Sequence, residues 1–265
     1  MGKVFETICG IVTAPAGVQT PLVLTPPDSL VVRSAKEGGK NYLLNAWVMN
    51  QGAGQFRMRS ALMHDAINNM RYDIQVALPD LLLALGCPQP IIAEDTILAD
   101  LSGSAVGGAI EQAFLMMFYD DIAGADQRLI SPADLKGKIK NILTMRNVIT
   151  PLAIGSWSGA AAINATEDRF KGNTDYAILG YIVDVPGGGV RYRGPDVSNI
   201  GVGGICNPAY RDQTVNWFVW LSEKYGLPLI PIVNSSNKAA TFVEVAQDDG
   251  AAVVTIDTIY AELSK

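Results

Sequence analysis

The residue types that carry most enzyme and metal chemistry are scarce in this chain. It has one histidine, His64, which lies beside Asp65, and three widely spaced cysteines, Cys9, Cys87 and Cys206. A catalytic triad or a metal site brings several imidazoles, thiolates or carboxylates to one point. These residues do not supply such a set. We therefore interpret His64 as a structural or interface residue, and we predict no metal site and no cofactor.

Carboxylates occur as adjacent pairs at three places. Two carboxylates could serve a glycoside hydrolase, and acids on loops could bind calcium. Adjacent acids at the ends of predicted strands are more often solvated turn residues, because Asp favours turns. We interpret all three pairs in this way. They are Glu94-Asp95, Asp120-Asp121 and Asp248-Asp249.

Two glycine-rich segments resemble catalytic or nucleotide-binding motifs only in part. Residues 155–159 read GSWSG, but a nucleophile elbow needs serine at the centre, where this chain has Trp157. Residues 201–204 read GVGG, yet no βαβ pattern surrounds them and the motif is broken by Cys206. We predict a flexible turn at residues 201–204, no catalytic residue, and a protein that is not an enzyme.

The composition favours a folded protein with a large core. The chain has 265 residues, of which 49% are hydrophobic and 17% charged, with a net charge of −6. This charge argues against direct nucleic-acid binding, which needs clustered Lys and Arg. The longest apolar run, residues 113–119, is far shorter than the roughly 20 residues of a membrane span, and we find no signal-peptide core. Sparse cysteines favour reduced thiols in a cytoplasmic setting.

The elements that position these residues follow a duplicated plan. Residues 41–67 and 175–201 align without a gap at an offset of 134 (175 − 41). Each copy has an Asx-Tyr pair, an apolar strand, a glycine-rich turn and a strand with Arg-x-Arg, which together predict a β-hairpin. The two arginines share one face, because side chains alternate along a strand. The aligned pairs include Tyr42 with Tyr176, Gly54 with Gly188, Arg57 with Arg191 and Arg59 with Arg193.

A second segment, a helix that ends at Gly-x-Pro, also recurs in both halves. Residues 79–85 and 214–225 are each predicted as a helix that ends at a glycine, Gly86 and Gly226, with a proline two residues later. A strand follows in each case. Two further helices are predicted at single sites, over residues 158–171 and after Ser131, the expected N-cap. The latter helix would carry in its second half Lys136, Lys138 and Lys140.

The remaining segments read as short strands, about eight in each half, and the run 113–119 is expected to be buried on both faces. Many short strands at regular spacing predict a sandwich or barrel. Eight strands in two facing sheets form a jelly roll. We predict an all-β fold of two tandem eight-stranded jelly rolls, each with a short helix before its last strands. The first would span residues 1–125 and the second residues 142–265, joined by a linker helix within 126–141.

This plan resembles the double jelly-roll major capsid proteins of tailless icosahedral viruses, a lineage that includes adenovirus hexon and the coat proteins of membrane-containing bacteriophages. The resemblance covers the whole chain. It rests on the duplication, on the two helix-Gly-x-Pro joints and on a length of 265 residues, which is close to a minimal version. In that lineage a helix stands between the sixth and seventh strands of each jelly roll.

The resemblance implies a structural virion protein rather than an enzyme. Such proteins form homotrimers whose six jelly rolls make a nearly hexagonal tile, and the tiles pack into an icosahedral capsid. Their partners are further copies, other capsid proteins such as a vertex protein, and often an internal membrane. Synthesis and assembly would occur in the host cytoplasm. The short turns at residues 52–54 and 187–189 depart from larger members, whose long loops form towers, so no receptor-binding surface is predicted.

Six residues are candidates for a subunit interface. Two tryptophans lie three positions apart on the predicted second-half helix and so share a side, which suits either a buried core helix or one that faces a neighbouring subunit. The paired arginines could bridge modules, bridge subunits or face solvent. The six residues are Trp217, Trp220, Arg57, Arg59, Arg191 and Arg193.

Two alternatives stay open at this point. The chain could be a minor capsid or vertex protein, which copy number per particle would distinguish. It could also be a carbohydrate-active enzyme or lectin built on two jelly rolls. That class needs a concave site lined with tryptophans and carboxylates, and no Trp–acid cluster occurs in the sequence.

Overall fold

The fold comes from a computed structural model. It describes residues 2–13, 18–24, 28–33, 40–49, 54–63, 67, 70–74, 81–102, 110–151, 153, 157–247 and 252–264. The predictions for His64, for Asp248-Asp249 and for the first two residues of the GSWSG segment lie outside these residues.

The first half of the chain forms two antiparallel sheets. The five-stranded sheet has the order β3 (Val23–Leu24), β1 (Gly2–Thr13), β9 (Ile110–Ile122), β4 (Asn41–Met49) and β7 (Gln89–Pro90). The four-stranded sheet has the order β2 (Gln19–Pro21), β8 (Leu98–Ser102), β5 (Gly54–Arg59) and β6 (Met70–Ile74). We call this half the first module.

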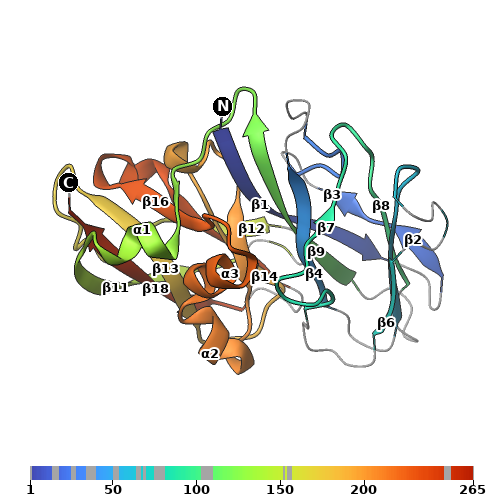
Figure 1. Cartoon of the computed structure of the whole chain (residues 1–265). Coiled ribbons are helices and arrows are strands. Elements are labelled where there is room, and N and C mark those ends of the chain that lie inside the picture. Colours follow the sequence, from blue (N-terminus) through green and yellow to red (C-terminus); the bar gives the residue numbers. More distant parts are fainter. Residues whose placement is uncertain are drawn as a thin grey trace.

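The second half, here the second module, repeats this arrangement. Its five-stranded sheet has the order β10 (Leu129–Ile130), β16 (Ile230–Asn234), β13 (Asp175–Val183), β18 (Val254–Leu263) and β11 (Ile139–Ile149). Its four-stranded sheet has the order β12 (Trp157–Ala162), β17 (Phe242–Ala246), β14 (Gly189–Arg193) and β15 (Val202–Ile205). The two modules lie side by side, one coloured from blue to green and the other from light green to red (Figure 1).

Both modules have the strand order of a jelly roll. Leaving out the short β3 and β10, we count the described strands of each module along the chain. One sheet then contains the first, eighth, third and sixth strands, and the other the second, seventh, fourth and fifth. This is the double Greek-key connection of the jelly roll. The predicted all-β fold of two tandem eight-stranded jelly rolls is confirmed.

The helices begin and end largely where capping residues predict. Helix α1 (Pro132–Lys136) starts at Ser131, whose side chain accepts a hydrogen bond from the Asp134 amide. It ends at Lys136, so the prediction that Lys138 and Lys140 also belong to it is wrong. Helices α2 (Arg211–Thr214) and α3 (Trp217–Tyr225) follow β15, and α3 ends at Gly226 with φ of 65°. They lie between the fifth and sixth strands of their module, not the sixth and seventh.

Short 3₁₀ turns complete the described helical structure. They cover Pro195–Val197, Pro208–Tyr210 and Ser235–Ala240. No helix in the described part of the chain is both long and apolar enough to cross a membrane.

The helix predicted over residues 158–171 is wrong. Residues Trp157–Ala162 form strand β12, paired with β17, and turns follow. The small side chains let the strand approach its neighbours closely: a Cβ on Gly159 would lie 2.6 Å from the side chain of Ile149. Sheet pairing has therefore overridden the helix propensity of the alanine run.

The helix predicted over residues 79–85 is also absent from its described part, residues 81–85. The backbone there is held instead by β4. The Leu82 amide donates to the Ala46 carbonyl. The Asn45 side chain accepts from the Leu83 amide and donates to the Leu83 carbonyl. Because these polar groups bond to β4, they are not available for helical hydrogen bonds.

The first module's five-stranded sheet is buried on both faces. Along β9, Leu115, Met117 and Tyr119 pack into the core between the two sheets of the first module, and Phe114, Met116 and Phe118 pack into the core of the second module. All six are at most 2% exposed. The prediction that residues 113–119 are buried on both faces is confirmed. The outer face of this sheet is therefore the surface against which the second module docks.

Candidate interaction surfaces

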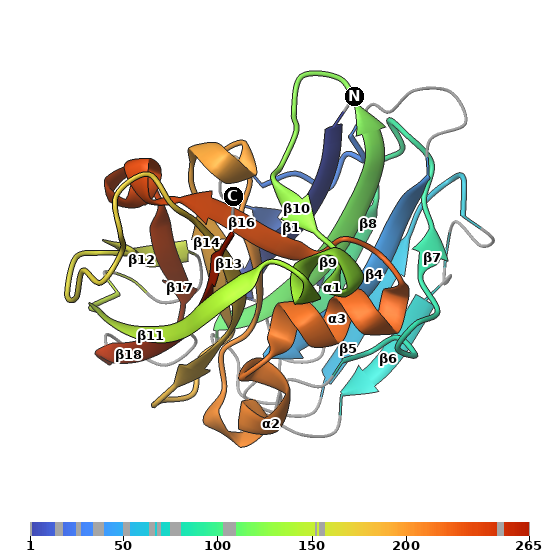
Figure 2. The same cartoon turned by 60° about the vertical axis from the view of Figure 1, so that its left-hand side comes forward.

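The two modules contact each other through different surfaces. The outer face of the first module's five-stranded sheet packs against the outer face of the second module's four-stranded sheet and against α3. Helix α3 lies across this junction beside β4 (Figure 2). The Tyr225 hydroxyl at its end donates to the Leu44 carbonyl at 2.7 Å, and Asn45 donates to the same hydroxyl at 3.2 Å. On β1, Phe5 meets Phe218 edge to face with ring centroids 6.4 Å apart.

Glycines in the second module allow a close approach. The Thr7 amide donates to the Gly201 carbonyl at 2.8 Å, and the Thr7 hydroxyl accepts from the Gly203 amide at 3.0 Å. A Cβ on Gly188 would lie 2.0 Å from the Gln112 side chain and 2.6 Å from the Phe114 ring. No other residue fits this position without displacing the first module. The glycine-rich turn predicted in the second copy is therefore a docking element.

Trp47 anchors the same region. Its indole nitrogen donates to the Gly188 carbonyl at 2.8 Å, and its ring stacks on Phe114 with centroids 4.8 Å apart and planes 4° apart. Both side chains are fully buried. Buried aromatic anchors of this kind typically carry much of the energy of an interface.

A buried ionic cluster centres on Arg191. Its Nη1 lies 2.7 Å from Asp28 Oδ1 of the first module, and its Nε lies 2.7 Å from Glu244 Oε2 on the neighbouring strand. The guanidinium lies 4.4 Å from the centroid of the Trp157 ring, a cation–π contact. The three charged side chains are 4–7% exposed. Of the three roles considered for the arginine pairs, Arg191 bridges the modules.

Asp28 has hydrogen bonds from both modules. Besides Arg191, it accepts from the Cys9 amide at 3.0 Å and from the Trp157 indole at 2.9 Å. A buried carboxylate needs such partners to offset its lost hydration. Burial, and then the Asp28 carboxylate, raise the pKa of the Cys9 thiol well above its ordinary value, although Arg191 opposes this. Cys9 is therefore a protonated packing residue rather than a nucleophile.

The Arg-x-Arg strand brackets one acid in each module. Arg57 and Arg59 lie 2.6 Å and 3.3 Å from Asp100 on the neighbouring strand, and Arg57 is level with Asp100 in the sheet. Arg191 and Arg193 bracket Glu244 in the same way, with Arg191 level with it. Sequence reasoning missed both acids. Their only signal was a single acid inside an apolar strand, in LADL and in FVEV.

The candidate subunit-interface residues differ in how much surface they offer. Trp217 is 1% exposed, and its indole donates to the Gly203 carbonyl inside the chain. Arg191 is buried between the modules. Neither has surface to give a neighbouring subunit. Trp220 is half-buried beside Trp217. The side chains of Arg57, Arg59 and Arg193 are 23%, 28% and 35% exposed, so their role in a subunit interface stays a prediction.

The second module leaves open the sheet face that corresponds to the buried docking face of the first module. A register shift at Lys3 in β1 recurs at Lys140 in β11, an offset of 137 (140 − 3). It places Ile142 at the position of Phe5 and Val148 at the position of Ile11. Phe5 is fully buried and Ile11 packs against the second module's core, whereas Ile142 is 56% and Val148 45% exposed.

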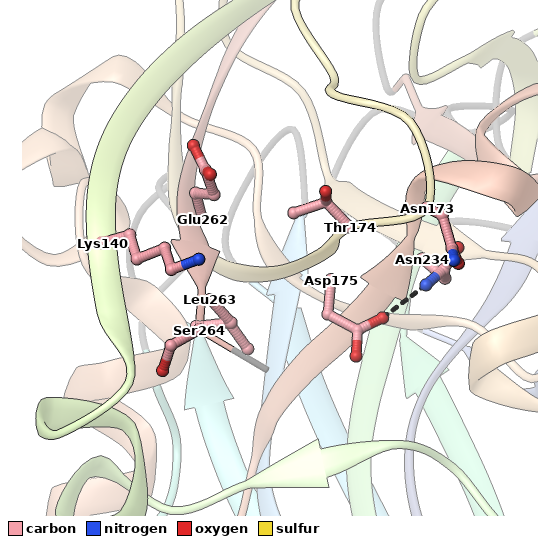
Figure 3. A pocket seen from close by; sticks show the side chains of 8 residues that line it. All are labelled: Lys140, Asn173, Thr174, Asp175, Asn234, Glu262, Leu263 and Ser264. Atoms are coloured by element: carbon pink, nitrogen blue, oxygen red, sulfur yellow. Dashed lines mark hydrogen bonds between the residues drawn. The ribbon is translucent and has the colours of Figure 1, made fainter.

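The two acids that line the polar recess at the end of the second module are each paired within the chain. The recess has a volume of about 490 Å³ and is lined by eight residues, among them Asp175 and Glu262 (Figure 3). Asp175 accepts from Asn234 at 2.7 Å and pairs with Arg128 at 2.6 Å. Glu262 pairs with Lys171 at 2.6 Å. Within the described ranges no cluster of three His, Cys, Asp or Glu residues could hold a metal ion.

The interpretation of the acid pairs as solvated turn residues is correct for Glu94, which is exposed in a turn, but wrong for Asp120 and Asp121, which lie near the end of strand β9. Glu94 and Asp121 have positive φ angles of 64° and 68°. Asp95 is buried and accepts a hydrogen bond from the Ser60 hydroxyl.

Comparisons with known proteins show remote similarity only. No family model matches the chain, and no curated protein matches its sequence. Among solved structures, the PBSX exported protein XepA shares 10% identity over 98% of this chain and 86% of its own, with a TM-score of 0.25. The major capsid protein P2 from bacteriophage PM2 shares 8% identity over 99% of this chain and 98% of its own, with a TM-score of 0.25. Neither similarity identifies the function of this chain.

Proposed function

We propose that this chain is a structural virion protein, a major capsid protein that forms homotrimers of six jelly rolls and tiles an icosahedral shell. One observation carries the proposal. The chain contains the same module twice, and the sheet face that the first module buries against the second is left open on the second. A further module, from another copy of the chain, would cover it.

The open face has the properties of an unfilled contact. On β11 the residues that point outward include the exposed apolar side chains of Ile142 and Val148. On the first module the outer face of the four-stranded sheet carries Arg57, Arg59 and Asp100. These residues match the arginines and the acid that the second module uses within the chain. Each chain therefore presents both halves of the contact that it makes internally.

A contact of this type is head to tail, since the two surfaces differ. Such contacts build a closed ring when the rotation between units divides the circle, and an open filament otherwise. Three chains of two modules each would make a ring of six. This is the trimer implied by the resemblance of the sequence to double jelly-roll capsid proteins. The net charge of −6 suits a coat that does not bind the genome directly.

The carbohydrate-binding alternative needs exposed tryptophans beside carboxylates. All four tryptophans of the chain are described. Trp47 and Trp217 are buried, Trp157 lies against Arg191, and Trp220 is half-buried on α3 beside Trp217. We therefore do not propose a carbohydrate-active enzyme or a lectin.

The mass of the purified protein over a concentration series tests the trimer. We expect a species of three chains. Ile142→Asp should shift it toward monomer, because a charge on the open face would be buried in the contact. Ile92→Asp, at a similarly exposed residue of the first module, is the control and should leave the trimer intact. A wild-type protein that stays monomeric at every concentration contradicts the proposal.

A further inference from the structure

We propose that Glu167 of one chain binds Arg57 of a second copy, repeating between chains the Asp28–Arg191 contact that joins the two modules within a chain. The proposal rests on the proposed trimer and names the pair of side chains that would hold its head-to-tail contact. Three observations support it: the placement of Glu167, the placement of Arg57, and the bonding that each has within its own chain.

Glu167 occupies in the second module the place of Asp28 in the first. Asp28 accepts a hydrogen bond from the backbone amide of Cys9 on β1. The offset of 137 that relates β1 to β11 places Arg146 at the position of Cys9 (9 + 137). Glu167 accepts from the backbone amide of Arg146 at 3.3 Å. Each carboxylate therefore binds the amide at the same level of the corresponding strand.

Arg57 occupies in the first module the place of Arg191 in the second. Both lie on the fourth strand of their jelly roll, level with the acid of the seventh strand, and each donates to that acid through Nε, to Asp100 at 3.1 Å and to Glu244 at 2.7 Å. An arginine that binds the acid through Nε can point another guanidinium nitrogen away from its own sheet. Arg191 binds Asp28 in this way through Nη1.

The two side chains lack within their own chain the strong contact that their counterparts have. No described residue accepts a hydrogen bond from Nη1 of Arg57, the atom that in Arg191 binds Asp28. Glu167 has a distant ion pair with Arg169, 3.4 Å apart, whose side chain is 61% exposed. The side chains of Glu167 and Arg57 are 34% and 23% exposed. Opposite charges are thus available on the two surfaces that the head-to-tail contact would join.

A double-mutant cycle on the full-length protein tests the pair. The variants are Glu167→Gln, Arg57→Gln and the double variant, and the readout is the trimer dissociation constant from sedimentation. We expect each single change to weaken the trimer at least about tenfold, and the double change to weaken it little more than either single change, since both remove one contact. Circular dichroism of each variant reports whether the monomer fold is intact.

A neighbouring residue provides a matched control. Asp168→Asn removes the same charge one residue away, but Asp168 pairs with Lys238 of its own chain. This change should leave the trimer within about threefold of wild type, given that surface ion pairs contribute little. If the wild type is trimeric but the Glu167 and Arg57 effects are absent or additive, the proposed pair is wrong and the trimer stands. If the wild type is monomeric, both proposals fail.

Discussion

Arg191 of the second module lies 2.7 Å from Asp28 of the first, and both side chains are 4% exposed. The same arginine also contacts Glu244 and the Trp157 ring, so one guanidinium joins two strands of its own sheet to the other module. Its counterpart in the first module, Arg57, pairs with the equivalent acid, Asp100, which lies on the same sheet as Arg57. The two copies of the module thus share one scaffold and differ in what lies against it.

Removing Arg191 should strongly destabilise the chain. In Arg191→Met, the Asp28 carboxylate would stay buried without its cation, and Glu244 would keep only Arg193. Breaking a buried pair in this way costs about 3–5 kcal/mol. Urea denaturation of the purified protein would measure the loss in the free energy of unfolding.

Arg193→Gln is the control for that change. Arg193 contacts the same Glu244 at 2.8 Å, but its side chain is 35% exposed. Exposed ion pairs contribute at most about 1 kcal/mol. Equal losses in the two variants would show that the buried cluster has no special role in joining the modules.

Gly188→Ala should lower the free energy of unfolding by weakening the contact between the modules, without adding charge. Its Cβ would lie 2.0 Å from the Gln112 side chain, across the module contact. Overpacking of this kind costs about 1–3 kcal/mol. Gly172→Ala is the matched control, because a Cβ there meets nothing within 4 Å. It should change the free energy of unfolding by no more than about 0.5 kcal/mol. Thermal denaturation of both variants checks this, and equal midpoints would contradict the described contact.

The protein should lose stability in alkali through its buried tyrosines. Burial raises the pKa values of Tyr119, Tyr181 and Tyr192 well above the ordinary tyrosine value, and Glu6 adds to the effect at Tyr119. An unfolded chain loses these protons near pH 10, whereas the folded chain keeps them. Stability is therefore fully present below about pH 10 and falls as the pH rises further.

A titration that follows tyrosinate absorbance and circular dichroism together checks this. We expect most of the tyrosinate signal to appear only as the β-sheet signal is lost. Full ionisation of all tyrosines in a chain that keeps its sheet signal would contradict the described burial.

Local patterns predicted much of the fold. The duplicated strand-turn-strand segment, the N-cap at Ser131 and the end of α3 at Gly226 are encoded within a few residues, so they could be found in the sequence. The prediction that each copy is a β-hairpin is wrong, because β4 and β5 lie in different sheets, and so do β13 and β14. The apolar run in β9 likewise indicated burial on both faces. The helix predicted over 158–171 failed because the pairing of β12 with β17 joins segments far apart in sequence.

The candidate surfaces were less accessible to sequence reasoning for the same reason. Asp28 and Arg191 are 163 residues apart in the chain, and nothing local to either residue indicates the other. Trp217 and Trp220 share a helix stripe, but which of them reaches the surface depends on how α3 packs. The similar sequences of the two strand-turn-strand segments also concealed their difference. Gly188 of the second segment docks against Phe114, whereas no second module lies against Arg57 of the first segment within the chain.

Electron microscopy of the purified wild-type protein tests the central proposal most directly. A head-to-tail trimer of two-module chains should appear as particles with three-fold symmetry, six lobes and a nearly hexagonal outline. Two-lobed single chains at every concentration, or open filaments without closed rings, would contradict the account of this chain as a trimeric capsid tile.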